Sequence, residues 1–192
     1  MVGNPPLLAD FDSMDYAMDQ SDLIALERLI ATELRRFRRP DPVIAVEIGS
    51  WSGLSALAIA QSGVRLFCVD HWEGNSADQC EVEKIAWTPD EAFARFCTNV
   101  QGLLFDRVFP FRCESRLAAS LWPNQVDIVY IDADPGYEHV KGDIVAWLPV
   151  IKNGGLLCGH GYETNFPGIM KAVGELGGHR VDSSVWWKRI IR

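Results

Sequence analysis

The chain has 192 residues and a net charge of −8, with 48% hydrophobic and 23% charged residues. This length and composition are typical of one globular domain. No stretch approaches the run of about 20 apolar residues that spans a bilayer, and the amino terminus shows no secretion signal. We therefore expect a cytoplasmic protein with no membrane partner. The acidic balance also disfavours nucleic acid as a partner, because phosphate backbones are bound by basic surfaces.

The five cysteines are scattered and include no Cys-x-x-Cys pair, which disfavours a zinc site or a disulfide framework. A reducing compartment fits this usage. Three of them fall in apolar runs, and we expect these to be reduced core residues: Cys68, Cys113 and Cys158.

The first twenty residues contain two prolines and many acidic residues, so we expect residues 1–20 to form an N-terminal arm and residues 21–192 to form a single domain. Ser21 is a suitable N-cap for a helix that runs to about Arg39. Apolar residues at helical spacing give this helix one buried face. They are Leu23, Leu26, Ile30, Leu34 and Phe37.

After Pro42 the pattern alternates between strands and helices. Strands are expected at Val43–Ile48, Arg65–Asp70, Arg107–Cys113, Val126–Ile131 and Gly155–Cys158. Helices are expected at Gly53–Gln61, from the capping box at Thr88, around Tyr137 to Leu148, and at Asn165–Leu176. Val181–Asp182 and Val185–Ile191 form a closing hairpin. This order predicts an α/β, Rossmann-like, doubly wound sheet of seven mostly parallel strands, with a C-terminal antiparallel hairpin and helices on both faces.

In the helix expected around Tyr137 to Leu148, five residues should face inward: Tyr137, Val140, Ile144, Val145 and Leu148. In doubly wound sheets, ligands bind at the carboxyl ends of the strands. The residues that follow each strand should therefore share one rim.

The segment Val46–Ser55 is the strongest functional signal, because a glycine-bearing loop follows a strand and opens a helix. Gly49 permits a tight turn, and Gly53 permits close packing of the helix. A dinucleotide-binding loop would carry another glycine in place of Trp51, so a nicotinamide oxidoreductase is disfavoured. S-adenosylmethionine has no phosphate and tolerates the bulky residue.

Asp70 ends the second strand, where an acid accepts hydrogen bonds from ribose hydroxyls. His71 and Trp72 follow directly and could flank an adenine, Trp72 by stacking. Glu114 and Ser115, after the next strand, are weaker candidates for the edge of the adenine.

From about Val43 to Ile191 the chain resembles class I S-adenosylmethionine-dependent methyltransferases, most closely the bacterial branch that resembles catechol-type and sugar O-methyltransferases. The matching stretches are Val46–Ser55, Val69–Gly74, Ile131–Asp134, Tyr137–Asp143 and Trp147–His160. The resemblance implies that Gly49, Ser50, Trp51 and Ser55 hold the methionine part of the cofactor, with ribose on Asp70. Glu47, Gly53 and Asp132 complete the expected cofactor-binding set.

The resemblance also implies a divalent metal, with one carboxylate ligand at Asp132 and two oxygen ligands at the positions of His160 and Gly161. Gly161 has no side chain, and a lone carboxylate holds a hard cation weakly. The branch's catalytic base lies three residues after the aspartate, where this chain has Pro135. Both departures count against a metal-dependent mechanism, so we expect no tightly bound divalent ion.

His160 is the first candidate for a general base, because an ordinary histidine pKa of about 6.5 suits that role. Asp132 and Asp134 are the alternatives, although Asp134 also suits a loop cap. The acceptor is expected to be a small molecule methylated at oxygen. An aromatic acceptor pocket could be lined by Trp87, Tyr137 and Tyr162.

Two other functions stay open. Asp134-Pro135-Gly136-Tyr137 approximates the loop with which amino-methyltransferases hold an exocyclic amine. Alternatively, the missing base and metal ligands fit a catalytically silent protein that binds the cofactor, or a partner subunit. The sequence leaves open whether the chain forms a homodimer.

Overall fold

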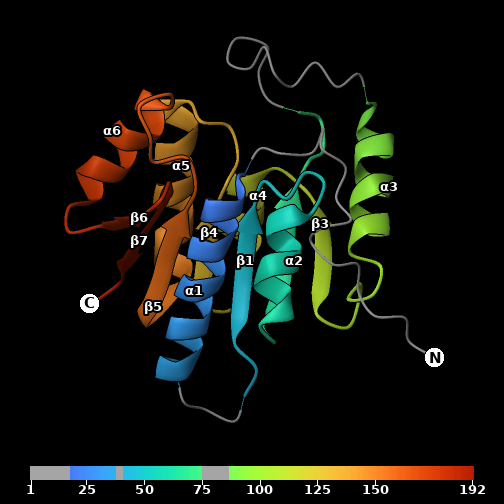
Figure 1. The fold of residues 1–192 in the computed structure, drawn as a ribbon, viewed down its shortest axis with the longest axis horizontal. Helices are drawn as coiled ribbons and strands as arrows, with labels where there is room; N and C mark the ends of the chain where they lie inside the picture. Colours follow the sequence, from blue (N-terminus) through green and yellow to red (C-terminus); the bar gives the residue numbers. More distant parts are fainter. Residues whose placement is uncertain (1–17, 38–40, 75–86) are drawn as a thin grey trace.

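A computed structural model of the chain describes residues 18–37, 41–74 and 87–192. Its centre is a seven-stranded sheet in the order β3-β2-β1-β4-β5-β7-β6 (Figure 1). The strands are β1 (Ile44–Ile48), β2 (Arg65–Asp70), β3 (Val108–Arg112), β4 (Val126–Ile131), β5 (Ile151–Gly159), β6 (Arg180–Asp182) and β7 (Val185–Arg189). The helices are α1 (Gln20–Phe37), α2 (Leu54–Gln61), α3 (Pro89–Asn99), α4 (Ser115–Leu121), α5 (Tyr137–Trp147) and α6 (Pro167–Leu176), with a short 3₁₀ turn η3 (Leu148–Val150).

The sheet is mixed, as predicted. Strands β1 to β5 pair in parallel, whereas β7 runs antiparallel to both β5 and β6. All six residues of β4 are buried, because the strand lies in the middle of the sheet with helices over both of its faces. This confirms the predicted Rossmann-like fold with its C-terminal antiparallel hairpin.

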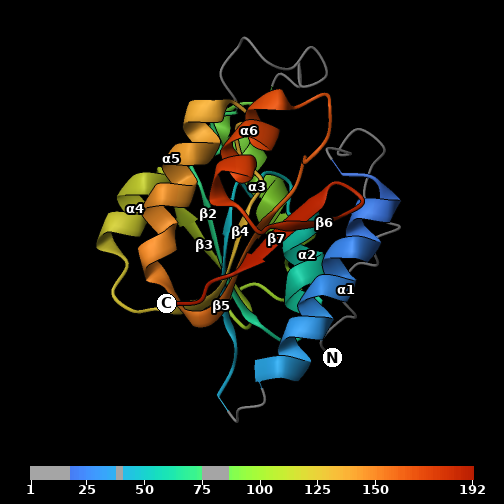
Figure 2. The same cartoon turned by 90° about the vertical axis from the view of Figure 1, so that its left-hand side faces the viewer.

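Helices cover both faces of the sheet (Figure 2). One core cluster joins the sheet to α1, α2 and α3 and includes Leu26, Leu57 and Phe96. The other joins it to α4, α5 and α6 and includes Val140 and Val173. Both cores bury apolar side chains almost completely, and this burial supplies the main driving force for the fold. No helix within residues 18–37, 41–74 and 87–192 is long and apolar enough to cross a membrane.

The beginning of α3 follows its sequence signal closely. Thr88 accepts a hydrogen bond from the Glu91 backbone, and the Glu91 carboxylate accepts one from the Thr88 backbone, so the capping box is present. Pro89 stands at the first helical position, where its missing N–H is not needed.

Several predicted details differ from the structure. Helix α4 was not expected, Val145 is 63% exposed rather than inward-facing, and Cys113 is only half-buried. The cap of α1 is Asp19, whose carboxylate accepts the Asp22 N–H. Residues 1–17 of the predicted arm, the predicted helix end at residues 38–39 and the cysteine at position 80 lie outside the described residues.

Candidate functional site

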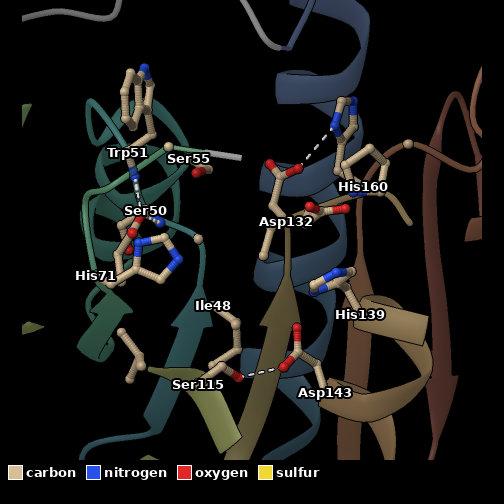
Figure 3. Close-up of a pocket in the computed structure, with 18 of the residues that line it drawn as sticks. Ile48, Ser50, Trp51, Ser55, His71, Ser115, Asp132, His139, Asp143 and His160 are labelled. Carbon is tan, nitrogen blue, oxygen red and sulfur yellow. Dashed lines mark hydrogen bonds and ion pairs between the residues drawn. The ribbon is translucent and has the colours of Figure 1, made fainter. Parts of the chain in front are cut away.

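A cavity of about 540 Å³ opens at the carboxyl ends of the parallel strands (Figure 3), a volume in the usual range for small-molecule sites. Ten of the predicted site residues line it: Gly49, Ser50, Trp51, Ser55, Asp70, His71, Glu114, Ser115, Asp132 and His160. Three others do not line it: Glu47, Gly53 and Trp72.

The two glycines of the β1–α2 loop serve close packing. Gly49 has φ +82°, and a Cβ there would lie 2.3 Å from the Asp132 carbonyl oxygen, so the ends of β1 and β4 can meet only at glycine. Gly53 has φ +90°, and its missing side chain makes room for Val100 and Phe96. Its missing side chain thus lets the loop pack against α3.

The carboxylate of Asp70 holds this loop in place. Its Oδ2 accepts the backbone N–H groups of Ser50 and Trp51, both at 2.9 Å, and its Oδ1 accepts that of Trp72 at 2.7 Å. A carboxylate offers about four acceptor positions, so one remains for a ribose hydroxyl. Sequence analysis did not predict that Asp70 holds the loop. The available signal was an acidic residue at the end of the strand that follows the loop.

Glu47 lies beneath the loop and is fully buried, which corrects the prediction that it contacts the cofactor. Burial raises the pKa of its carboxyl to about 7, while the nearby side chains of Ser50, Ser55 and Cys68 limit the rise. Within the described residues, neither of its carboxyl oxygens has a hydrogen-bond partner. Its side chain is therefore mainly neutral below about pH 7.

Trp72 is also a correction, because its ring belongs to the core. It is 1% exposed, packs edge-on against Phe93 with ring centroids 4.8 Å apart, and donates its indole N–H to the Trp51 carbonyl at 2.8 Å. It cannot stack on an adenine from there. His71, in contrast, is exposed and lines the cavity.

Another part of the cavity lining lies where the first turn of α4 meets α5. The Ser115 hydroxyl donates to Asp143 at 2.6 Å and accepts the Trp147 indole N–H at 3.0 Å. Burial raises the pKa of Asp143, which lines the cavity together with His139 one turn earlier. Sequence analysis missed both residues; their spacing of four along a helix after β4 was the available signal.

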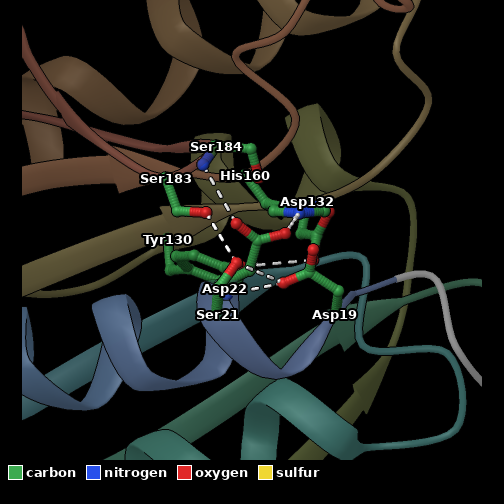
Figure 4. Close-up of polar contacts among 8 residues, drawn as sticks. All are labelled: Asp19, Ser21, Asp22, Tyr130, Asp132, His160, Ser183 and Ser184. Carbon is green, nitrogen blue, oxygen red and sulfur yellow. Dashed lines mark hydrogen bonds and ion pairs between the residues drawn. The ribbon is translucent and has the colours of Figure 1, made fainter.

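At the other end of the cavity, His160 lies between two carboxylates (Figure 4). Its Nδ1 is 3.3 Å from Asp132 Oδ1, and its Nε2 is 3.0 Å from Asp22 Oδ2. The second oxygen of Asp22 accepts the Ser184 N–H at 2.9 Å, and Asp132 accepts the Tyr130 hydroxyl at 3.2 Å. Asp22 comes from α1, and no sequence signal connects it to a residue 138 positions away.

This environment overturns the expectation of an ordinary histidine pKa. Burial by itself would lower the pKa of His160, but the carboxylates of Asp132 and Asp22 outweigh it and raise the pKa to about 9. Burial would likewise raise the pKa of Asp22, yet hydrogen bonds from Ser184, Ser183 and His160 lower it to about 2. At neutral pH His160 is therefore a protonated imidazolium, which cannot act as a general base.

The donor set does not fit the divalent metal that the branch implies. Gly161 has φ +77°, and a Cβ there would lie 2.7 Å from the Ile169 side chain, so no ligating side chain can occupy that position unless the wall moves. The two nitrogens of His160 both face carboxylates. Among the residues that the structure describes, no three His, Cys, Asp or Glu side chains form a group that could hold a metal ion.

The predicted aromatic pocket is also corrected, because none of its three residues lines the cavity. The Tyr137 hydroxyl donates to Glu175 and accepts from Lys141, both on the outer side of α5 and α6. Tyr162 packs against His179, and Trp87 stacks on Trp51 with ring centroids 5.8 Å apart. Asp134 caps its own loop by accepting the Gly136 N–H.

Known structures share this fold. A putative O-methyltransferase from Klebsiella pneumoniae aligns with a TM-score of 0.64 and 12% identity, over 93% of this chain and 83% of that one. An O-methyltransferase from Bacillus cereus in complex with SAH aligns with a TM-score of 0.62 and 14% identity, over 96% of this chain and 86% of that one. A putative caffeoyl-CoA O-methyltransferase from Staphylococcus aureus aligns with a TM-score of 0.59 and 14% identity, over 93% of this chain and 92% of that one. At such identities the likeness shows the fold alone.

No curated protein matches the chain. The model of a methyltransferase domain family, however, matches residues 46–162, which is more than half of the chain. The matched segment contains the β1–α2 loop, the carboxylate that holds it, and the strand ends that carry Asp132 and His160. The chain therefore belongs to this family of methyltransferase domains.

Proposed function

We propose that the protein is an S-adenosylmethionine-dependent methyltransferase that methylates an oxygen atom of a small-molecule acceptor. The observation that carries this proposal is the single cavity that joins the Asp70-held loop to the carboxylate of Asp132. Membership of the methyltransferase family supports it. The O-methyltransferases among the structural neighbours, one of them in complex with SAH, favour this cofactor and oxygen as the methylated atom.

The residues present suit this cofactor. Helix α2 begins at Leu54, and its N-cap Gly53 offers no side-chain hydrogen bond, so N–H groups of its first turn are available to the carboxylate of a methionine moiety. Asp70 keeps one acceptor position for ribose. His71, Ser115 and Asp143 line the part of the cavity that we assign to adenine.

S-adenosylmethionine, when bound, supplies a methyl group on a positively charged sulfur. The residues of the chain supply position and proton transfer. Asp132 faces the cavity, and its side chain is 23% exposed, so we assign it as the acceptor of the hydroxyl proton. His160, as an imidazolium, donates to Asp132 and fixes the orientation of that carboxylate. His160 is thus a positioning residue in this proposal, in place of the base expected from the sequence.

Calorimetric titration with S-adenosylhomocysteine tests the cofactor site. The wild type should bind it, and NAD should not compete. Asp70→Ala should weaken binding by roughly 1–3 kcal/mol, because a hydrogen bond to a charged group and the support of the loop are both lost. Gly49→Val should abolish binding, because its side chain would collide with the end of β4.

Asp106→Ala, at an exposed position away from the cavity, is the matched control and should bind like the wild type. Unchanged affinity in both site variants would show that the cofactor lies elsewhere. Binding without turnover over a broad acceptor panel would instead favour the catalytically silent alternative. The amine-methylating alternative gains no support from the structure, because Tyr137 lies outside the cavity.

A further inference from the structure

The end of the cavity next to Asp132 has one polar and one apolar wall. Asp132 and His160 form the polar wall (Figure 3). Ile169 stands against both of them, since all three line a small adjoining void of about 10 Å³. The apolar wall is built from Phe166 and Ile169 at the beginning of α6; Met18 before α1 and Pro135 after β4 also line the cavity.

Gly161 allows the apolar wall to come this close. A Cβ at this position would lie 2.7 Å from Ile169 Cδ1 and 3.4 Å from the Phe166 ring. Both of these side chains line the cavity. The space that a polar side chain at position 161 would need is therefore filled by α6, and the wall there is hydrocarbon.

The polar wall has little capacity to bind a second hydroxyl group of the methyl acceptor. Both nitrogens of His160 are directed at carboxylates, so they are not available to a ligand. Asp134, which also lines the cavity, commits one oxygen to the Gly136 N–H at 2.8 Å. Asp132 already accepts from His160 and Tyr130, which reduces its capacity for further hydroxyls, and it is the group that faces the reacting hydroxyl. A second hydroxyl on the neighbouring carbon of the acceptor would be buried against the apolar wall, which costs free energy when no partner is present.

We propose that the acceptor is a hydrophobic phenol or alcohol that presents a single hydroxyl to Asp132 and an apolar neighbouring substituent to Phe166 and Ile169, rather than a pair of adjacent hydroxyls. This inference rests on the proposed function. In the reaction, the hydroxyl proton passes to Asp132, the new bond joins the acceptor oxygen to the methyl carbon, and the bond from that carbon to sulfur breaks. The products are the methyl ether and S-adenosylhomocysteine.

Three phenols that differ only at the neighbouring carbon test the proposal: phenol, 2-methylphenol and catechol. For the purified full chain, kcat/KM should be about tenfold or more higher for 2-methylphenol than for catechol, because an apolar wall rewards a methyl group and penalises an unpaired hydroxyl. Binding of the same compounds to the complex with S-adenosylhomocysteine, followed by calorimetry, should give the same order. Chelation of divalent ions with EDTA should change neither result.

Ile169→Thr tests the wall itself. It should reduce the preference for 2-methylphenol over catechol at least severalfold while leaving the affinity for S-adenosylhomocysteine unchanged. Val173→Thr is the matched control, because Val173 is a buried residue of the same helix that does not line the cavity. It should keep the wild-type preference. Urea unfolding of both variants separates a change of preference from a loss of fold.

Catechol as the better substrate or ligand, or activity that disappears with EDTA, would overturn the proposal. The same holds if the protein binds S-adenosylhomocysteine but none of the three phenols. Failure to bind S-adenosylhomocysteine at all would instead contradict the proposed function, so the two failures are distinguishable.

Discussion

At the scale of single residues, the chemistry of this site depends on the partners of each side chain more than on its identity. His160 was identified correctly as a residue of the rim, but its pKa could not be read from the sequence. It depends on Asp22, which reaches His160 only through tertiary packing of α1. Trp72 illustrates the same limit, because stacking and core packing demand the same kind of residue and only burial distinguishes them.

The protonation of His160 gives a direct test at this scale. Its raised pKa predicts that the imidazole titrates near pH 9 and shows no midpoint near 6.5. NMR titration of the ring nitrogens, with His160→Gln to assign the signal, measures this. Asp22→Asn should move the midpoint downward, because one of the two carboxylates that stabilise the imidazolium is neutralised. A midpoint near 6.5 in the wild type would restore His160 as a general base.

At the scale of elements, strands buried on both faces were the easiest to predict. The expected bounds of β2 and β4 agree with the structure, because both are short runs of mostly apolar, strand-favouring residues. Helix α4 was missed because its seven residues show no long periodic pattern. Its cap, Glu114, was instead assigned to the ligand; in the structure it accepts the Leu117 N–H and also lines the cavity.

The capping box of α3 predicts a measurable contribution to stability. Thr88→Ala should lower the free energy of unfolding by about 1 kcal/mol, because the helix loses its side-chain cap. Urea unfolding followed by circular dichroism measures the change. Thr98→Ala, at an exposed position in the last turn of the same helix, is the control and should have almost no effect. Equal effects of the two substitutions would show that the box does not stabilise α3.

At the scale of the whole molecule, the acidic chain encloses a buried carboxyl whose ionisation opposes folding. The pKa of Glu47 is about 7 in the folded protein, against an ordinary value of 4.5. The raised pKa of Glu47 therefore contributes fully to the free energy of unfolding below pH 4.5. This contribution is lost as the pH rises through about 7. The free energy of unfolding should decline across this interval.

Glu47→Gln tests the origin of that decline, since the amide cannot ionise. The variant should show a flatter dependence of stability on pH between 4.5 and 7 in urea unfolding experiments. Between pH 6.5 and 9, loss of the proton from His160 lowers stability in both proteins, because its folded pKa is also raised. An unchanged slope below pH 7 in the variant would mean that Glu47 is not the group responsible.

The contact between Asp22 and His160 also has a consequence for biosynthesis. Asp22 lies near the beginning of the chain, His160 follows the fifth strand, and Ser184, which Asp22 also binds, lies close to the end. A ribosome produces these three residues at widely separated times. Even after the loop and the first parallel strands have been synthesised, the imidazolium cannot acquire its two carboxylates until His160 itself has emerged, and Asp22 gains its Ser184 contact later still. The orientation of Asp132 is thereby tied to synthesis of the chain through His160, so a chain that terminates before this residue contains the cofactor loop without this cluster.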